Sequence, residues 1–248
     1  MRLKGLITVN TIKFEAYKEL SEAVAREMAE LAAKKPGALF CVAAGHSSLG
    51  VFNAAVDMYS KGLIDFSQSY FVAMDEWLGM SVRMPGSCGD FLTRNFLSKV
   101  NFPKGNVRLF DGTVAPPEGE CEAVGAYIAG RGGIDYIVLG VGMNGHLALN
   151  EPGTAFDASV HVTALDEVTA RVGQKYFDGR KTELSGGLTI GLREITASKR
   201  AVLCVNGVKK AEVLKRTLTG PVGADFPATA LRGMNNASVY YDAEAGGL

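Results

Sequence analysis

A histidine and a carboxylate lie five positions apart in a glycine-rich segment of the chain. His146 and Glu151 belong to the run GVGMNGHLALNEP, residues 140–152. A carboxylate beside an imidazole makes the ring more basic, and such a pair moves protons near neutral pH. The apolar residues 134–139 predict a buried parallel strand directly before it. Loops that leave such strands carry chemistry in α/β proteins, so we predict a proton shuttle here, with a structural histidine as the alternative.

Two adjacent acids form a second cluster. Asp75 and Glu76 come directly after the apolar segment 70–74, which predicts another strand. A carboxylate at the end of a buried strand needs a partner or a shifted pKa, and in that state Asp75 could abstract a proton from carbon. The alternative is a turn or a helix cap over residues 77–79.

The third and fourth clusters suit an anion. Gly45-His46-Ser47-Ser48 opens a predicted helix, where backbone N–H groups and hydroxyls can hold a phosphate. This segment is neither a P-loop nor a dinucleotide fingerprint, and the alternative is a simple N-cap. Lys210 follows the predicted strand 201–205 and could supply a countercharge.

Strand and helix patterns alternate along the chain. Apolar segments at 39–43, 70–74, 136–141 and 201–205 predict strands, and helical spacing recurs from Phe14 to Leu31 and from Val51 to Tyr59. We therefore predict one α/β domain over residues 1–248, with a Rossmann-like, mostly parallel sheet and helices on both faces. Such a sheet brings all four clusters to one edge, which predicts a single active site.

Composition excludes several classes of partner. The 248 residues hold 26 Lys and Arg against 26 Asp and Glu, so no net field recruits nucleic acid or an anionic membrane. Four cysteines without CxxC spacing predict reduced, structural thiols, and His46 and His161 have no metal-ligand spacing. No apolar run approaches the ~20 residues that cross a bilayer, and we expect a cytoplasmic protein.

Taken together, the motifs resemble the glucosamine-6-phosphate deaminase/isomerase family, within the 6-phosphogluconolactonase superfamily. The matching runs are Gly45-x-Ser-Ser-x-Gly50, Met74-Asp-Glu-Trp-x-Gly79, residues 140–152 and Gly207-x-x-Lys210-Ala211. The resemblance implies that Asp75 moves the C2 proton of an amino sugar toward C1, that His146 opens the sugar ring and that Glu151 assists it. It implies phosphate contacts from the loop 45–48, from Lys210 and from Lys175, which replaces a family arginine. No organic cofactor or metal is implied.

Asn144 is a departure from the glucosamine enzymes, which have aspartate there. The galactosamine-6-phosphate branch is more similar to this chain, so the main prediction is conversion of galactosamine 6-phosphate to tagatose 6-phosphate and ammonia. An amide has no negative charge with which to stabilise an imidazolium, so with Asn144 in this position Glu151 would be the nearer charge partner of His146. His161 and Thr163 stand where allosterically activated members have basic residues, which predicts that this regulation is absent.

Three alternatives remain open at this stage. They are a glucosamine-6-phosphate deaminase giving fructose 6-phosphate, a 6-phosphogluconolactonase, and a non-catalytic sugar-phosphate sensor. The expected partner is a small sugar phosphate, and the oligomeric state is left open between monomer and homo-oligomer.

Overall fold

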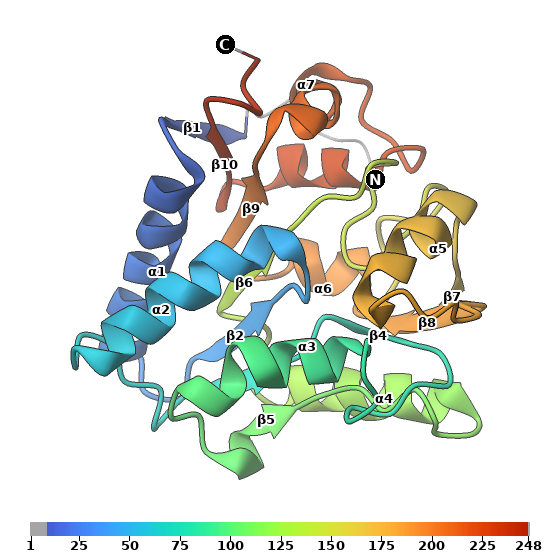
Figure 1. The fold of residues 1–248 in the computed structure, drawn as a ribbon, viewed down its shortest axis with the longest axis horizontal. Helices are drawn as coiled ribbons and strands as arrows, with labels where there is room; N and C mark the ends of the chain where they lie inside the picture. Colours follow the sequence, from blue (N-terminus) through green and yellow to red (C-terminus); the bar gives the residue numbers. More distant parts are fainter. Residues whose placement is uncertain (1–8, 248) are drawn as a thin grey trace.

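A seven-stranded parallel sheet forms the centre of the molecule (Figure 1). The computed structural model describes residues 9–247, so residues 1–8 and 248 of the predicted domain lie outside it. The strand order is β1-β10-β9-β6-β2-β3-β5, and every neighbouring pair is parallel. The bounds are β1 Asn10–Phe14, β2 Leu39–Val42, β3 Tyr70–Val72, β5 Val107–Arg108, β6 Tyr136–Leu139, β9 Ala201–Val205 and β10 Ala237–Asp242.

Helices cover both faces of this sheet. In Figure 1, α1 (Tyr17–Lys34), α2 (Leu49–Ser60) and α3 (Cys88–Asn95) lie in front of it, and α4 (Pro117–Ala129) and α6 (Leu192–Thr196) lie behind. Strands β2, β6 and β9 are buried along their whole length, as continuous apolar runs require when both faces are covered. The predicted α/β fold with a mostly parallel sheet is confirmed. No helix among the described residues is both long and apolar enough to span a membrane.

A second, smaller sheet was not predicted. Strands β4 (Asp75–Trp77), β8 (Gly186–Thr189) and β7 (His161–Ala164) pair antiparallel in the order β4-β8-β7. The turn expected at residues 77–79 does follow β4, because the N–H of Met80 donates to Trp77 O at 3.1 Å, but Asp75 itself lies in the strand. Short helices complete the chain: α5 Glu167–Gly173, α7 Ala211–Thr219, and the 3-10 turns η1 His46–Ser48, η2 Leu97–Lys99, η3 Lys104–Asn106, η4 Gln174–Phe177, η5 Val208–Lys210 and η6 Pro227–Gly233.

The first helix begins three residues later than its apolar spacing suggests. Phe14 ends β1, where it is paired with Asp242 of β10, and Ala16 has an extended backbone before α1 starts at Tyr17. The aromatic ring of Phe14 contacts Tyr240, with ring centroids 5.3 Å apart. Phe14 is therefore apolar because it packs in the edge strand β1, not because it belongs to the helix. Helical periodicity alone does not distinguish these two cases.

Asp135 anchors the edge of the sheet opposite the strand ends that carry the predicted site. Its Oδ1 accepts from Lys35 at 2.5 Å and Lys199 at 2.7 Å, and Oδ2 accepts from the backbone N–H of Leu39 at 2.9 Å. Burial alone would raise the pKa of Asp135, but the hydrogen bonds from Lys199 and Lys35 lower it below its usual range. The carboxylate is thus ionised at neutral pH.

We expect Asp135→Ala to destabilise the protein by about 3 kcal/mol at pH 7, since the buried N–H of Leu39 loses its acceptor and two charged hydrogen bonds disappear. Because the folded pKa is lowered, the difference should shrink as the pH falls below about 4. Urea unfolding at pH 7 and pH 3.5 measures both effects. Asp57→Ala, which removes an exposed ion pair with Lys61, serves as the control, and an equal loss in both variants would contradict the argument.

Candidate active site

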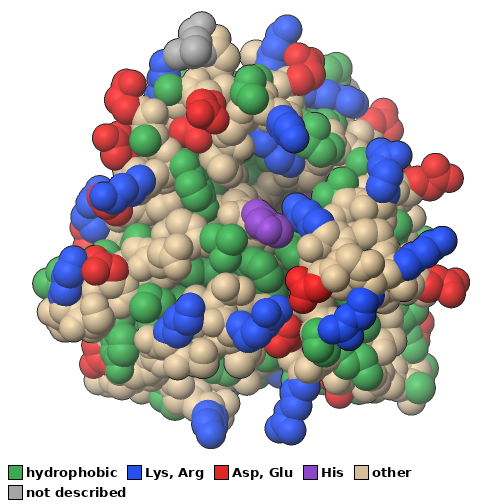
Figure 2. All heavy atoms as spheres, in the orientation of Figure 1, with side chains coloured by type: hydrophobic (Ala, Val, Ile, Leu, Met, Phe, Trp, Pro, Cys, Tyr) green, Lys and Arg blue, Asp and Glu red, His purple; other side chains and the backbone are tan. Residues whose placement is uncertain are grey.

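The predicted clusters meet at one cavity of about 540 Å³ beside the carboxyl ends of β2, β6 and β9. Seven of the ten residues proposed from the sequence line it: Gly45, His46, Ser47, Asp75, His146, Lys175 and Lys210. Figure 2 shows a hollow on this face of the molecule, with a histidine and several basic side chains around it. The other three residues, Ser48, Asn144 and Glu151, lie behind the lining.

Asp75 is a buried carboxylate in the wall of the cavity. It begins β4, whose alternation turns Asp75 and Trp77 to the cavity and Glu76 to the other side. Burial raises the pKa of Asp75 to about 6, although the Cys88 thiol and the nearby His146 pull it down. A carboxylate with a raised pKa is a stronger base than a solvated one and is still ionised at neutral pH.

Glu76 fixes the loop that follows β4. Its carboxylate accepts from the backbone N–H groups of Trp77, Cys88 and Gly89, each at 2.9 Å. The N-terminus of α3 therefore points at this carboxylate, and Ser87 caps the helix by accepting from Asp90 at 2.9 Å. Burial nevertheless raises the pKa of Glu76 to about 8. Glu76 is thus a structural acid, and Asp75 is the one that faces the cavity.

The loop that carries His146 depends on its glycines. A Cβ at Gly142 would lie 2.4–2.5 Å from the imidazole ring, so the ring packs directly on the glycine backbone. Gly145 has a φ of +89°, a conformation that favours glycine. The loop closes through hydrogen bonds from Gly142 N to His146 O at 3.0 Å and from Gly145 N to Gly142 O at 3.1 Å. These contacts explain the spacing GxGxNGH.

Glu151 and Asn144 lie behind the imidazole. Glu151 Oε2 is 3.4 Å from His146 Nδ1 and accepts from Asn144 Nδ2 at 2.7 Å. The Asn144 Oδ1 accepts from the backbone N–H of His146 at 3.2 Å. Burial alone would raise the pKa of Glu151, but His146 outweighs it, with help from Thr169 and Asn144, so the pKa is lowered. Glu151 is therefore the ionised group nearest to the imidazole, and Asn144 holds it in place.

The loop 45–48 forms η1 rather than a simple helix cap. Tyr17 clamps it, because its hydroxyl donates to Ser47 O at 2.9 Å and accepts from Gly50 N at 2.8 Å. The Ser47 side chain lies against Gly140, where a Cβ would be 2.6 Å from Oγ. Ser48 corrects the sequence-based proposal: it is buried, does not line the cavity, and its N–H donates to Gly45 O at 2.9 Å. It is therefore not positioned to contact a phosphate.

Two lysines give this end of the cavity its positive charge. Lys210 Nζ donates to Val141 O at 2.5 Å, and burial followed by repulsion from Lys175 lowers the pKa of Lys210 to about 8. Burial also lowers the pKa of Lys175, which lies 5.0 Å above the ring of Tyr176. Lys210 is half-buried and Lys175 is exposed, and two ammonium groups that repel each other are suited to a dianion, which would relieve the repulsion.

Several residues of the cavity were missed from the sequence. Trp77, Cys88, Thr169 and Tyr176 all line it. Within residues 9–247 the indole nitrogen of Trp77 is buried and has no hydrogen-bond partner. The Tyr176 ring lies 5.3 Å from that of His46. These side chains come from β4, α3 and the segment α5–η4.

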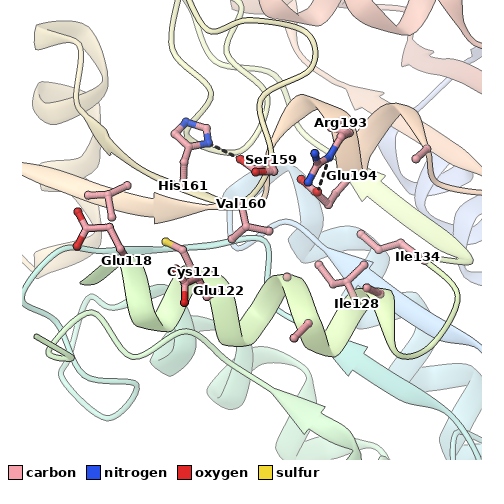
Figure 3. Close-up of a pocket in the computed structure, with 16 residues that line it drawn as sticks. Glu118, Cys121, Glu122, Ile128, Ile134, Ser159, Val160, His161, Arg193 and Glu194 are labelled. Atoms are coloured by element: carbon pink, nitrogen blue, oxygen red, sulfur yellow. Dashed lines mark hydrogen bonds and ion pairs between the residues drawn. The ribbon is translucent and has the colours of Figure 1, made fainter. Parts of the chain in front are cut away.

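A larger cavity of about 840 Å³ lies away from this site (Figure 3). It opens between α4 and the edge formed by β7 and α6, and none of the proposed site residues lines it. His161 projects beside it, and its Nδ1 contacts Ser159 O at 2.7 Å. Across residues 9–247, no three His, Cys, Asp or Glu side chains are gathered as metal ligands are.

The fold and the cavity define a class of protein. A buried carboxylate, an imidazole with its own carboxylate, and an anion-binding loop at the carboxyl edge of a parallel sheet are typical of an α/β acid–base enzyme. The family model for glucosamine-6-phosphate isomerases/6-phosphogluconolactonase matches residues 13–240. The chain therefore belongs to this family.

Relatives of similar length support the assignment. The chain is 33% identical over 246 residues to a glucosamine-6-phosphate deaminase from Thermoanaerobacter pseudethanolicus, covering 99% of this chain and 95% of the relative. It is 31% identical over 240 residues to one from Clostridium acetobutylicum, covering 97% and 98%.

Solved structures agree with the fold. One described as a monomeric glucosamine-6-phosphate deaminase has a TM-score of 0.92 at 30% identity and covers 96% of this chain and 98% of its own. A 6-phosphogluconolactonase from Thermotoga maritima has a TM-score of 0.73 at 20% identity, with 94% and 98% covered. At that identity the second similarity concerns the fold alone.

Proposed function

We propose that this protein is a hexosamine-6-phosphate deaminase that converts glucosamine 6-phosphate and water to fructose 6-phosphate and ammonia. The observation that carries the proposal is that one cavity combines a buried carboxylate, an imidazole and two lysines, in Asp75, His146, Lys175 and Lys210. These groups match the three tasks of the reaction, which are to hold the phosphate, to open the ring and to move a proton at C2. A lactonase needs no base at C2, so Asp75 favours the deaminase.

The proposed reaction begins with the phosphate at the loop 45–47 and the two lysines. His146 takes the proton of the C1 hydroxyl and passes it to the ring oxygen as the bond between C1 and that oxygen breaks, which opens the ring to the aldehyde. Asp75 removes the C2 proton and returns it at C1, while one proton of the C2 ammonium moves to the C1 oxygen, so the C2 nitrogen becomes an iminium group. Water adds to C2 and the C–N bond breaks, which leaves a ketone at C2 and releases ammonia.

Glucosamine 6-phosphate is preferred to its C4 epimer for two reasons. The relatives described above are glucosamine-6-phosphate deaminases. In addition, the amide of Asn144 contacts Glu151 and the backbone of His146 and does not line the cavity, so it has a role in the loop that does not depend on C4. The argument for galactosamine 6-phosphate, which rested on Asn144, thereby loses its support.

The direct test is ammonia release from purified protein with each hexosamine 6-phosphate. We expect turnover of both with a higher kcat/KM for glucosamine 6-phosphate, and fructose 6-phosphate as the product from that substrate. A higher kcat/KM for galactosamine 6-phosphate would restore the epimer prediction, and no ammonia from either would overturn the proposal.

The pKa values of the cavity predict how activity depends on pH. Asp75 acts when ionised, so kcat/KM should rise as the pH passes about 6. Lys210 binds the phosphate when protonated, so kcat/KM should fall as the pH passes about 8. Lys210→Arg keeps its charge at every pH of the assay and should remove the alkaline fall. A profile that falls equally in the wild type and the arginine variant would assign the alkaline limb to another group.

A further inference from the structure

The hydroxyl of Thr169 touches the imidazole that is proposed to open the sugar ring. Thr169 lies on α5, and its Oγ1 is 3.0 Å from His146 Nδ1. The residue is 5% exposed, so water does not compete strongly for this contact. Among the described residues no hydrogen bond reaches the other ring nitrogen, Nε2, which leaves it free for a ligand.

The surroundings of Nδ1 decide which ring nitrogen carries the proton. Glu151 Oε2 lies 3.4 Å from Nδ1 and already accepts from Asn144 at 2.7 Å, and an ionised carboxylate can only accept. A proton on Nδ1 is therefore stabilised by this negative charge, whereas a lone pair there would be repelled. In that tautomer the Thr169 oxygen accepts from Nδ1–H, and its own proton is free to point to Glu151.

Distance makes the hydroxyl more important than the carboxylate for orientation. At 3.0 Å the contact with Thr169 is a hydrogen bond, whereas 3.4 Å to Glu151 is too long for a strong one. The carboxylate thus favours a proton on Nδ1 through its charge, and the hydroxyl adds the hydrogen bond that holds this proton on Nδ1 and fixes the direction of the ring. The backbone of Gly142 packs against the imidazole ring and limits its movement on that side. The hydrogen bond from Thr169 would restrain the rotation of the side chain that this packing still allows.

We propose that Thr169 is a positioning residue whose hydroxyl accepts the Nδ1–H of His146 and so keeps Nε2 unprotonated and directed at the substrate. The inference rests on the proposed function for its effect on rate, but its effect on the tautomer concerns the protein alone. The same segment carries Lys175 six residues later, so one short piece of chain would hold both the phosphate and the histidine.

The test compares two substitutions that differ in one feature. Thr169→Val keeps the shape and removes the hydroxyl, and Thr169→Ser keeps the hydroxyl and removes the methyl group. ¹⁵N NMR of the imidazoles reports the tautomer directly, and with three histidines the His146 signals are those missing from a His146→Asn sample. We expect the Nδ1–H form in the wild type and in Thr169→Ser, and a mixture in Thr169→Val.

Kinetics give the second readout. Thr169→Val should lower kcat about 10- to 100-fold with KM nearly unchanged, and Thr169→Ser should recover most of the loss. If Thr169→Val fails to fold, Thr169→Ala replaces it. An unchanged tautomer in a folded variant would overturn the inference, whatever the rate. If the wild type releases no ammonia but the tautomer still shifts, the proposed function fails and the positioning role stands.

Discussion

Replacing Asp75 by asparagine is expected to lower the rate of ammonia release about 10³-fold or more. The amide has nearly the same shape but cannot take a proton from C2, and general base catalysis of this kind contributes about 10²- to 10⁴-fold. Because the pKa of Asp75 is raised to about 6 by burial, the carboxylate is both ionised and a good base at neutral pH. The amide has neither property, so the loss should appear in kcat rather than in KM.

The experiment measures kcat and KM for ammonia release in the wild type and in Asp75→Asn. Asp57→Asn, on the exposed face of α2, is the control for a carboxylate-to-amide change and should keep its activity. Thermal unfolding shows whether the variant folds. A lactonase would lose little activity with this change. The lactonase alternative would therefore be favoured if the wild type released no ammonia and Asp75→Asn still hydrolysed 6-phosphogluconolactone.

The parallel sheet could be predicted because its strands are buried on both faces. Such strands are continuous apolar runs, and the one at Ala201–Val205 has the predicted bounds. Since parallel strands all end at one edge, the residues that follow them were expected to share a site, and six of those proposed on this ground do line one cavity. The apolar runs along the chain and the shared edge at which parallel strands end were therefore enough to predict the parallel sheet and the position of the cavity.

The small antiparallel sheet could not be predicted in the same way. Asp75–Trp77 has three residues, two of them acids, and Gly186–Thr189 begins with two glycines, so neither segment has strand-like composition. Their pairing depends on contacts between residues more than 100 positions apart. Asp75 thereby belongs to a strand whose alternation directs it into the cavity, which is a more rigid support than the turn considered as the alternative.

Residues brought to the site by distant segments were also missed. Thr169 contacts His146 across 23 positions, and Tyr17 clamps Ser47 across 30. Each is a common residue type in an amphipathic helix, and nothing in its neighbours indicates chemistry. Ser48 is the opposite case, because its type and position suggest a phosphate contact but the 3-10 turn buries it. Tertiary packing decides both outcomes.

Replacing Lys210 by methionine is the second change with a large expected effect. The side chain is half-buried and directed by its hydrogen bond to Val141 O, so its charge is poorly screened by solvent. Removing one partner of a buried, hydrogen-bonded charge pair costs about 2–5 kcal/mol, so kcat/KM should fall about 30-fold to 4,000-fold. The phosphate lies away from the reacting carbons, so the loss should be mainly in KM.

The pattern of inhibition separates this role from a general disturbance of the site. Inorganic phosphate should compete with substrate in the wild type and much less in Lys210→Met, since the lysine would contact the phosphate and not the sugar. Lys215→Met, on the exposed face of α7, removes a nearby charge and should leave both KM and phosphate inhibition close to wild type.

If Lys210→Met lowered kcat at unchanged KM, the lysine would act on the reacting carbons instead, and the phosphate would have to be held by Lys175 and the loop 45–47 alone. Because Lys175 lowers the pKa of Lys210, removing Lys175 should strengthen the charge of Lys210, so the double variant should lose more than the sum of the single losses.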